Sequence, residues 1–227
     1  EALDQVGVLT KVEAAGEKIL QMEAPVKTVT EATPRFAEIP KDMVLIPEGT
    51  FKYGENAEEK YLPAFLIDRH AVTNRRYGEF LQQAGYRVPK YWTDPRFNKP
   101  DQPVVGVSLM DAKKFASWAG CELATEQQYE KAARGPDGRT YPWGNDVTKN
   151  VADFAQDPEL GSAKPVGSHP GAKSPFGAFD MAGCVWEWTN SNHPESENSK
   201  VIKGGSWCDA ERYLRTYSSL FASVREK

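Results

Sequence analysis

The stretches FGAFDMAGCVWEWT (residues 176–189) and KVIKGGSW (residues 200–207) decide the fold of this chain. If the first stretch is extended, Trp186 and Trp188 share one face of a strand and Glu187 lies on the other. Two indoles on a core face with an acid opposite are typical of a packed sheet whose acid meets a metal ion or a salt bridge. In the second stretch, Gly204 and Gly205 indicate a backbone that approaches another group closely.

Trp207 follows the two glycines directly and is open to two interpretations. It is either a plug in the core or the wall of a ligand cleft. Large aromatic side chains more often pack into cores than carry ligands, which favours the plug.

Helical and strand patterns precede these stretches. The apolar spacing predicts three helices, at residues 74–84, 109–119 and 126–133. Ser108 with Asp111 and Thr125 with Gln128 form capping boxes at the starts of the second and third helices. The runs MVLIPEGTF and LPAFLIDRHAV predict strands, whereas the second half of the chain carries mostly turn signals. The pattern therefore predicts an α+β domain whose second half is rich in loops.

Composition excludes several classes of protein. The chain has 227 residues, 40% of them hydrophobic, which is enough for one large domain or for one domain plus an appendage. Its 28 basic and 32 acidic side chains give a formal net charge of −4, which argues against a nucleic-acid binder. No apolar run approaches the roughly 18 residues of a membrane span, so we expect none. The sequence contains no P-loop, G-x-G-x-x-G or G-x-S-x-G motif. It therefore does not indicate a nucleotide-binding loop or the nucleophile turn of an α/β-hydrolase.

The cysteines and histidines are few and widely spaced. They are Cys121, Cys184, Cys208, His70, His169 and His193. This spacing does not form a zinc-type C-x-x-C pair or a paired-histidine motif, although a site assembled over long range remains possible. Three cysteines permit one disulfide or three free thiols, and they leave the compartment open.

The first 40 residues differ from the rest in their pattern of apolar residues and prolines. An apolar stripe at helical spacing comprises Leu3, Val6, Leu9, Val12, Ile19 and Met22. It predicts an amphipathic helix, and the proline-flanked stretch after Pro25 predicts an extended linker. A solvated leader is the alternative. We therefore divide the chain into a helix and linker at residues 1–40 and a domain at residues 41–227. The start at Glu1 rather than Met implies either processing or an artificial boundary of the chain, and we expect a periplasmic or extracellular location rather than a cytoplasmic one.

Three further motifs stand upstream in a fixed order: DMVLIPEGTFKYG (42–54), IDRHAVTNRRYGEFL (67–81) and the stretch from PVVGVS to YPWGN (103–145). Together with FDMAGCVWEW and KVIKGGSW, this series resembles the formylglycine-generating enzyme family, the sulfatase-modifying-factor domain. The resemblance runs from about Asp42 to the C-terminus. It implies an α+β, C-type-lectin-like fold with little regular secondary structure, preceded here by the N-terminal helix and linker.

In catalytic members of this family, the resemblance implies copper held by two cysteines shortly after the G-G-S-[WY] motif. Thiolate is the soft ligand that such a copper ion prefers. Here Cys208 lies near the first position, while Tyr213 and Leu214 occupy the region of the second. One thiolate cannot supply this site, so we do not expect copper. Iron-dependent relatives take histidine ligands from a preceding helical bundle that this sequence does not contain.

The resemblance also implies structural calcium bound by carboxylates, Asn side chains and backbone carbonyls. In NVADFAQD, Asn150 and the Val151 carbonyl match the first calcium segment, and Asp157 matches it more loosely. In MAGCVWEW, the Val185 carbonyl and Glu187 match a weaker second segment. There Cys184 stands in place of an Asn, and a thiol is a poor calcium ligand.

The resemblance further implies a ligand-binding face in the variable stretch after G-G-S-W. Candidate residues of this face are Trp207, Asp209, Glu211, Arg212, Tyr213, Arg215 and Tyr217. Family members usually end on a G-F-R strand, whereas this sequence ends in SVREK, so we expect an exposed C-terminal sheet edge. We expect a protein partner to bind the N-terminal helix and this edge.

These observations favour a non-catalytic domain that acts as a binding or scaffolding subunit of a larger assembly. The alternative is a copper- or iron-dependent oxidase that oxidises a cysteine or another thiol with O2, using Cys208 with Cys121 or Cys184. A sugar-binding lectin is a third hypothesis, but the sequence lacks the E-P-N or Q-P-D signature. Fold alone does not decide among these functions.

Overall fold

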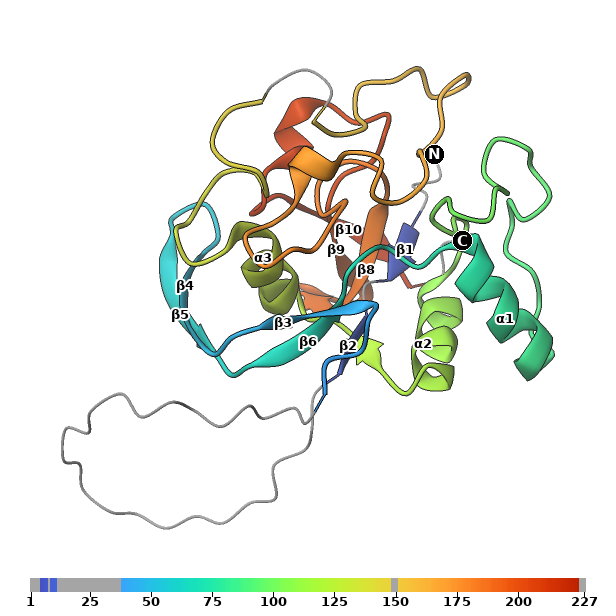
Figure 1. The fold of residues 1–227 in the computed structure, drawn as a ribbon, viewed down its shortest axis with the longest axis horizontal. Helices are drawn as coiled ribbons and strands as arrows, with labels where there is room; N and C mark the ends of the chain where they lie inside the picture. Colours follow the sequence, from blue (N-terminus) through green and yellow to red (C-terminus); the bar gives the residue numbers. More distant parts are fainter. Residues whose placement is uncertain (1–4, 8, 12–37, 148–150, 225–227) are drawn as a thin grey trace, which may run out of the picture.

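The structure is a computed structural model that describes residues 5–7, 9–11, 38–147 and 151–224. Its described part contains two four-stranded sheets, one two-stranded hairpin and three α-helices (Figure 1). The family-like α+β fold expected from the motifs is confirmed. No helix in this part of the chain is long and apolar enough to cross a membrane.

The first sheet has the order β1-β8-β9-β10. Its strands are β1 (Gln5–Gly7), β8 (Trp186–His193), β9 (Ser196–Lys203) and β10 (Ser219–Ser223). The pairs β8–β9 and β9–β10 are antiparallel, whereas β1 runs parallel to β8. The strand β10 pairs only with β9 among the described strands, so one of its edges faces outward.

The second sheet has the order β3-β6-β2-β7. Its strands are β3 (Met43–Ile46), β6 (Phe65–Asp68), β2 (Leu9–Lys11) and β7 (Glu122–Leu123). The hairpin of β4 (Gly49–Tyr53) and β5 (Glu58–Leu62) extends from β3.

The three α-helices begin where the capping residues predict. They are α1 (Asn74–Ala84), α2 (Leu109–Trp118) and α3 (Glu126–Arg134). Both capping boxes are present, so two otherwise unpaired backbone N–H groups are satisfied at the start of each of α2 and α3. Gly85 ends α1 in the left-handed region, at φ 59°, which glycine adopts without strain. These local signals therefore fix the helix boundaries to within about one residue.

The prediction of an N-terminal helix is wrong where the structure describes that segment. Gln5–Gly7 and Leu9–Lys11 are strands, and they pair with β8 in the first sheet and with β6 and β7 in the second. Backbone pairing with distant strands has overridden the helical spacing of the apolar residues. The rest of the predicted helix and most of the linker lie outside the described residues. The described strands of this segment thus share the sheets of the domain predicted at 41–227.

Two apolar clusters form most of the core. The larger one joins the first sheet to α1 and α2, and it contains Trp186 and Trp188, both fully buried. The smaller one joins the second sheet to α3 around Ile67 and Tyr129. The expectation that Trp186 and Trp188 face a core is confirmed.

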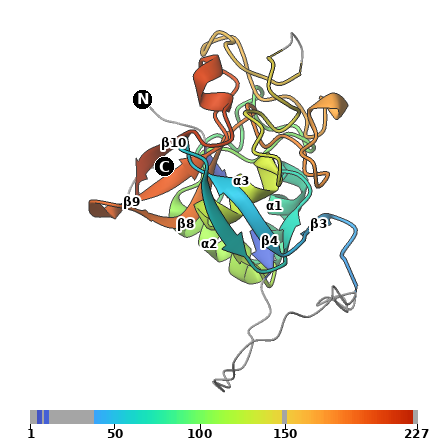
Figure 2. The ribbon, with the colours of Figure 1, turned by 90° about the vertical axis from the view of Figure 1, so that its left-hand side faces the viewer.

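The long connection from α3 to β8 contains no strand among its described residues and a single short 3₁₀ helix, η1 (Pro170–Ala172). A second 3₁₀ helix, η2 (Glu211–Leu214), follows the G-G-S-W segment. Figures 1 and 2 both place these loops together at one end of the molecule. The loop-rich second half is confirmed, and the residues after G-G-S-W lie at its loop end.

Candidate functional site

The G-G-S-W segment leaves β9 with two glycines that other residues could not replace without strain. Gly204 has φ 103°, and a Cβ there would lie 2.7 Å from the Tyr129 hydroxyl. Gly205 has φ 76°, and a Cβ there would lie 2.9 Å from the Tyr213 carbonyl oxygen. The close approach predicted from the two glycines is confirmed on both.

Trp207 is a core plug, as the sequence favours. Its side chain is buried and its ring centroid lies 5.4 Å from that of Phe97. The inclusion of Trp207 in the ligand face is therefore wrong, because the ring is covered by the loop before α2. Its indole Nε1 is buried without a hydrogen-bond partner.

Asp209 is half-buried, and one of its carboxylate oxygens is held by this turn. Its Oδ2 accepts hydrogen bonds from the Ser206 hydroxyl (2.5 Å), the Ser206 N–H (2.9 Å) and the Trp186 indole N–H (2.7 Å). Three donors on one oxygen hold the carboxylate in place. The place of Asp209 in the ligand face stays a prediction.

Cys208 is half-buried, and its Sγ lies 3.4 Å from the Ser206 Oγ. Because the Ser206 hydroxyl donates to Asp209, its oxygen is left to accept from the thiol. The thiol, hydroxyl and carboxylate thus form a short polar chain at the start of the loop end of the molecule.

The other two cysteines lie in different surroundings. Cys184 is buried at φ 68°, and burial together with Asp180 and Asp153 raises the pKa of its thiol well above the ordinary value. Cys121 is half-buried in the link from α2 to β7. No disulfide joins any of the three. Within the described ranges, no group of three or more His, Cys, Asp or Glu side chains is arranged to hold a metal ion.

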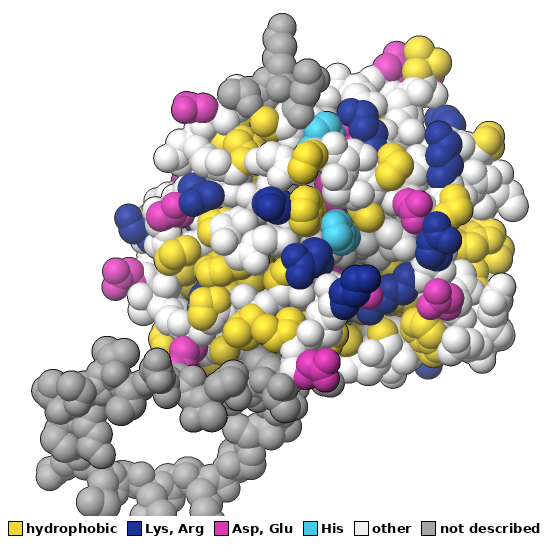
Figure 3. All heavy atoms as spheres, in the orientation of Figure 1, with side chains coloured by type: hydrophobic (Ala, Val, Ile, Leu, Met, Phe, Trp, Pro, Cys, Tyr) yellow, Lys and Arg dark blue, Asp and Glu magenta, His cyan; other side chains and the backbone are white. Residues whose placement is uncertain are grey.

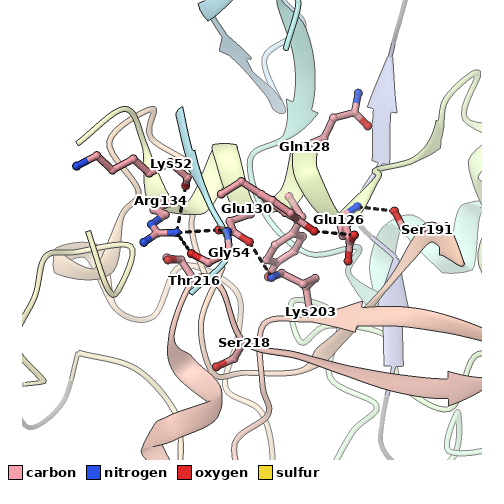
Figure 4. A network of polar contacts seen from close by, with 12 residues as sticks. Lys52, Gly54, Glu126, Gln128, Glu130, Arg134, Ser191, Lys203, Thr216 and Ser218 are labelled. Atoms are coloured by element: carbon pink, nitrogen blue, oxygen red, sulfur yellow. Dashed lines mark hydrogen bonds and ion pairs between the residues drawn. The ribbon is translucent and has the colours of Figure 1, made fainter. Parts of the chain in front are cut away.

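A buried charge network anchors the segment that carries Cys208 (Figure 4). Lys203, the residue before Gly204, places its Nζ 3.4 Å from Glu130 Oε2, and both side chains are almost completely buried. Glu130 Oε1 accepts hydrogen bonds from Arg134 (2.9 Å) and from the Gly54 N–H (2.7 Å). Arg134 in turn donates to the carbonyls of Lys52 and Gly54. One carboxylate on α3 therefore ties the end of β9 to the β4–β5 hairpin.

Glu187 is buried beneath this segment, on the face of β8 opposite the two indoles. The Tyr129 hydroxyl donates to its Oε1 (3.1 Å), while its Oε2 has no hydrogen-bond partner. Burial raises the pKa of Glu187 well above its ordinary value, and the nearby Asp180 and Asp68 raise it further. A second acid, Asp180, which the sequence patterns did not point to, therefore lies near Glu187. The pKa of this residue, Asp180, is raised to about 6, mainly by burial.

A buried carboxylate oxygen without a partner suits a hard cation, so the residues at Glu187 and Asp180 fit calcium on chemical grounds. The Val185 carbonyl, expected from the sequence as a ligand, lies 3.3 Å from the position that a Gly204 Cβ would occupy. The signal that could have identified Asp180 is its place in the same FDMAGCVWEW stretch, seven residues before Glu187.

The first calcium segment is described only in part. Asn150 lies outside the described residues, and Val151 is half-buried. Asp157 is exposed, and its Oδ1 caps a turn by accepting from the N–H groups of Glu159 and Leu160. The first calcium site stays a prediction.

The remaining ligand-face residues line η2 and the chain after it. Glu211 and Arg212 are exposed, whereas Tyr213, Arg215 and Tyr217 are half-buried. Glu211 accepts from the Tyr141 hydroxyl (3.0 Å), and the Arg212 guanidinium lies 4.6 Å from the centre of the Tyr213 ring. These polar and aromatic residues stay candidates for binding.

Two clefts lie elsewhere and were not predicted. One of about 340 Å³ lies at the start of α1 and is lined by His70, Arg75, Arg76 and Glu79, among others. Figure 3 shows Lys and Arg side chains around a histidine on this face. The other, of about 390 Å³, lies beside Cys121 and β7. Cys208 and the ligand-face residues do not line either of them.

Comparisons with known proteins place these features in context. The family model described as "Sulfatase-modifying factor enzyme 1-like domain" matches residues 28–226. A formylglycine-generating enzyme of Thermomonospora curvata is 30% identical, with 79% of this chain and 87% of that protein covered. The inactive C-alpha-formylglycine-generating enzyme 2 of Mus musculus is also 30% identical, with 74% of each covered.

A hercynine oxygenase of Mycolicibacterium thermoresistibile is 32% identical over 68% of this chain, and the chain spans about half of that protein, 46%. Among solved structures, PvdO from Pseudomonas aeruginosa aligns with a TM-score of 0.68 at 22% identity, covering 82% of this chain and 91% of PvdO. The structural likeness supports the fold alone.

Proposed function

Because the chain belongs to the sulfatase-modifying factor enzyme 1-like family, we propose that it uses this fold as a non-catalytic binding or scaffolding domain of a larger assembly. The observation that carries the proposal is the lone thiol after G-G-S-W. The neighbour of Cys208 is the Ser206 hydroxyl, and Tyr213 stands where the family resemblance places a second thiolate. A soft metal ion that needs two thiolates lacks the second one here.

The surroundings of Cys184 support the same proposal. Its thiol is fully buried among the acids Asp180, Asp153 and Glu187, all of which raise its pKa. A thiol in such a place stays protonated, and the thiolate is the form that binds metal or attacks a substrate. Cys184 is therefore a poor second ligand for a metal held by Cys208.

The relatives include both kinds of protein. Two are named formylglycine-generating enzyme and hercynine oxygenase, and another is named an inactive member. Family membership thus leaves room for a metal-dependent oxidase, which is our second candidate. The feature that favours the oxidase is that Cys208 is half-buried, so its side chain is partly accessible to solvent.

One experiment separates the two candidates. The purified chain is incubated with Cu(I), a reductant, O2 and a cysteine peptide bearing the sulfatase motif, and the peptide is analysed by mass spectrometry. The scaffold proposal expects no aldehyde product and no tightly bound copper or iron. Product that is lost in the Cys208→Ser variant, but kept in the matched Cys121→Ser variant, would establish the oxidase instead.

We further propose that the binding surface comprises the η2 face of Glu211, Arg212 and Tyr213 together with the outer edge of β10. The edge carries Phe221, which is 47% exposed and lies 3.9 Å, centroid to centroid, from the His193 ring. A strand edge that has no neighbour among the described strands and that carries an exposed aromatic side chain is suited to a protein partner. The proposed cofactor is structural calcium held near Glu187 and Asp180, where it would neutralise one buried acid and one half-buried acid.

A further inference from the structure

The strands β1 and β2 pair with strand edges that the other described strands leave unpaired. Gln5, Val6 and Gly7 pair in register with Trp186, Glu187 and Trp188 along the free edge of β8. A residue later the chain enters the second sheet, where Thr10 pairs with Ile67 of β6 on one side and with Glu122 of β7 on the other. The strand β2 is therefore central, and without it β7 has no hydrogen-bonded neighbour in this sheet.

The connection from β2 to β3 joins two parallel strands of the same sheet. Thr10 and Val44 both pair with Ile67, so β2 and β3 flank β6 and run in the same direction. Parallel strands in one sheet need a crossover of about a dozen residues or more. The sequence supplies 31 residues, 12–42, between them. This length is more than the crossover within one copy requires.

We propose that the β8 edge and the gap between β6 and β7 form a strand-accepting site, and that the strands β1 and β2 of a second copy of this chain can fill it. The result is a strand-exchanged dimer in which each copy completes both sheets of the other. The second copy is the occupant because its strand repeats every pairing seen within one chain. A fully extended chain of 31 residues would reach up to about 100 Å.

The balance between the two arrangements depends on concentration. For any connection of 31 residues, random-coil statistics give an end-to-end distance of about 30 Å, which corresponds to an effective concentration of about 1 mM for the strand of the same chain. The pairings are identical in both arrangements, so the monomer dominates at low concentration. The strand-exchanged dimer dominates once the connection is too short to pass from β2 across β6 to β3.

The decisive variant deletes residues 12–37 and leaves five residues, 38–42, before β3. Five residues span at most about 17 Å and fall short of a parallel crossover. We expect this variant to elute as a dimer in size-exclusion chromatography with light scattering, with a thermal midpoint within about 3 °C of the full chain. A monomer, or a chain that does not fold, would overturn exchange between copies.

A second measurement tests the strand-accepting site in the full chain. Thr10→Pro removes a backbone donor from the middle of the second sheet, so it should lower the thermal midpoint by about 5 °C or more. A synthetic peptide of residues 1–13 should then restore the midpoint in a saturable manner, because it binds only the folded state. The matched control in the chain is Thr10→Val, which keeps the donor and should leave the midpoint unchanged. The control peptide carries Thr10→Pro and should have no effect. If the unmodified peptide also has no effect, the site does not accept a strand in trans and the proposal fails.

Discussion

Glu130 is the side chain on which the anchoring of the G-G-S-W segment depends. The Glu130→Gln variant keeps the volume of the side chain and removes its charge, which leaves Lys203 and Arg134 without an anion. The side chains of Glu130 and Lys203 are 1% and 2% exposed, and that of Arg134 is 5% exposed. Removing one partner of such a buried group costs about 3–5 kcal/mol, because the remaining charge is buried without compensation.

For a chain of this length, each kcal/mol shifts the thermal midpoint by about 2–4 °C, so we expect Glu130→Gln to lower it by about 10 °C. Differential scanning calorimetry measures this shift. The matched control is Glu126→Gln on the same helix. Glu126 accepts a hydrogen bond from the Tyr53 hydroxyl (2.7 Å) in a half-buried place, and its replacement should cost only about 1 kcal/mol.

Two further readouts decide whether charge is the cause. The double variant Glu130→Gln with Lys203→Met removes the lysine charge together with the acid and should recover most of the loss. The reaction rate of Cys208 with a thiol reagent should rise in Glu130→Gln, because the end of β9 is no longer fixed to α3. If the single variant melts within about 2 °C of the parent, or the double variant melts below the single one, the reasoning is refuted.

Three other predictions follow from the site and its surroundings. The chain should not convert a sulfatase-motif cysteine peptide to formylglycine with Cu(I) and O2, and aldehyde detected by mass spectrometry would contradict this. Calcium should raise the thermal midpoint over that in chelator, and Glu187→Gln should abolish the difference; equal midpoints for the parent with and without chelator would exclude the ion. Burial, which outweighs the contact with Arg76, raises the pKa of Asp68 to about 6 from 3.8, so the folded state binds this proton more tightly than the unfolded state. The contribution of Asp68 to the free energy of unfolding should therefore fall by about 3 kcal/mol as the pH rises from about 4 to about 6, and urea titrations of Asp68→Asn should lack this component.

The sequence by itself determined the parts of the structure that local chemistry controls. The starts of α1, α2 and α3 follow from side chains that satisfy backbone N–H groups within three residues, which does not require the rest of the fold. The alternation of Trp186, Glu187 and Trp188 predicted their two faces, because strand geometry alone sets that period. The glycines at 204 and 205 predicted a close approach, since a positive φ or a missing Cβ is the usual reason for such a pair.

Tertiary structure decided what depends on residues far apart in the sequence. The apolar spacing near the N-terminus indicated a helix, yet Gln5–Gly7 and Leu9–Lys11 became strands because β8, β6 and β7 offered unpaired backbone groups there. The surroundings of Asp209 also depend on a distant residue, because the Trp186 indole N–H on β8 donates to its carboxylate. Asp180 and Glu187 gained their significance only when folding brought the half-buried Asp180 near the buried Glu187. Burial and backbone pairing are sums over distant contacts, and no local pattern in the sequence records them.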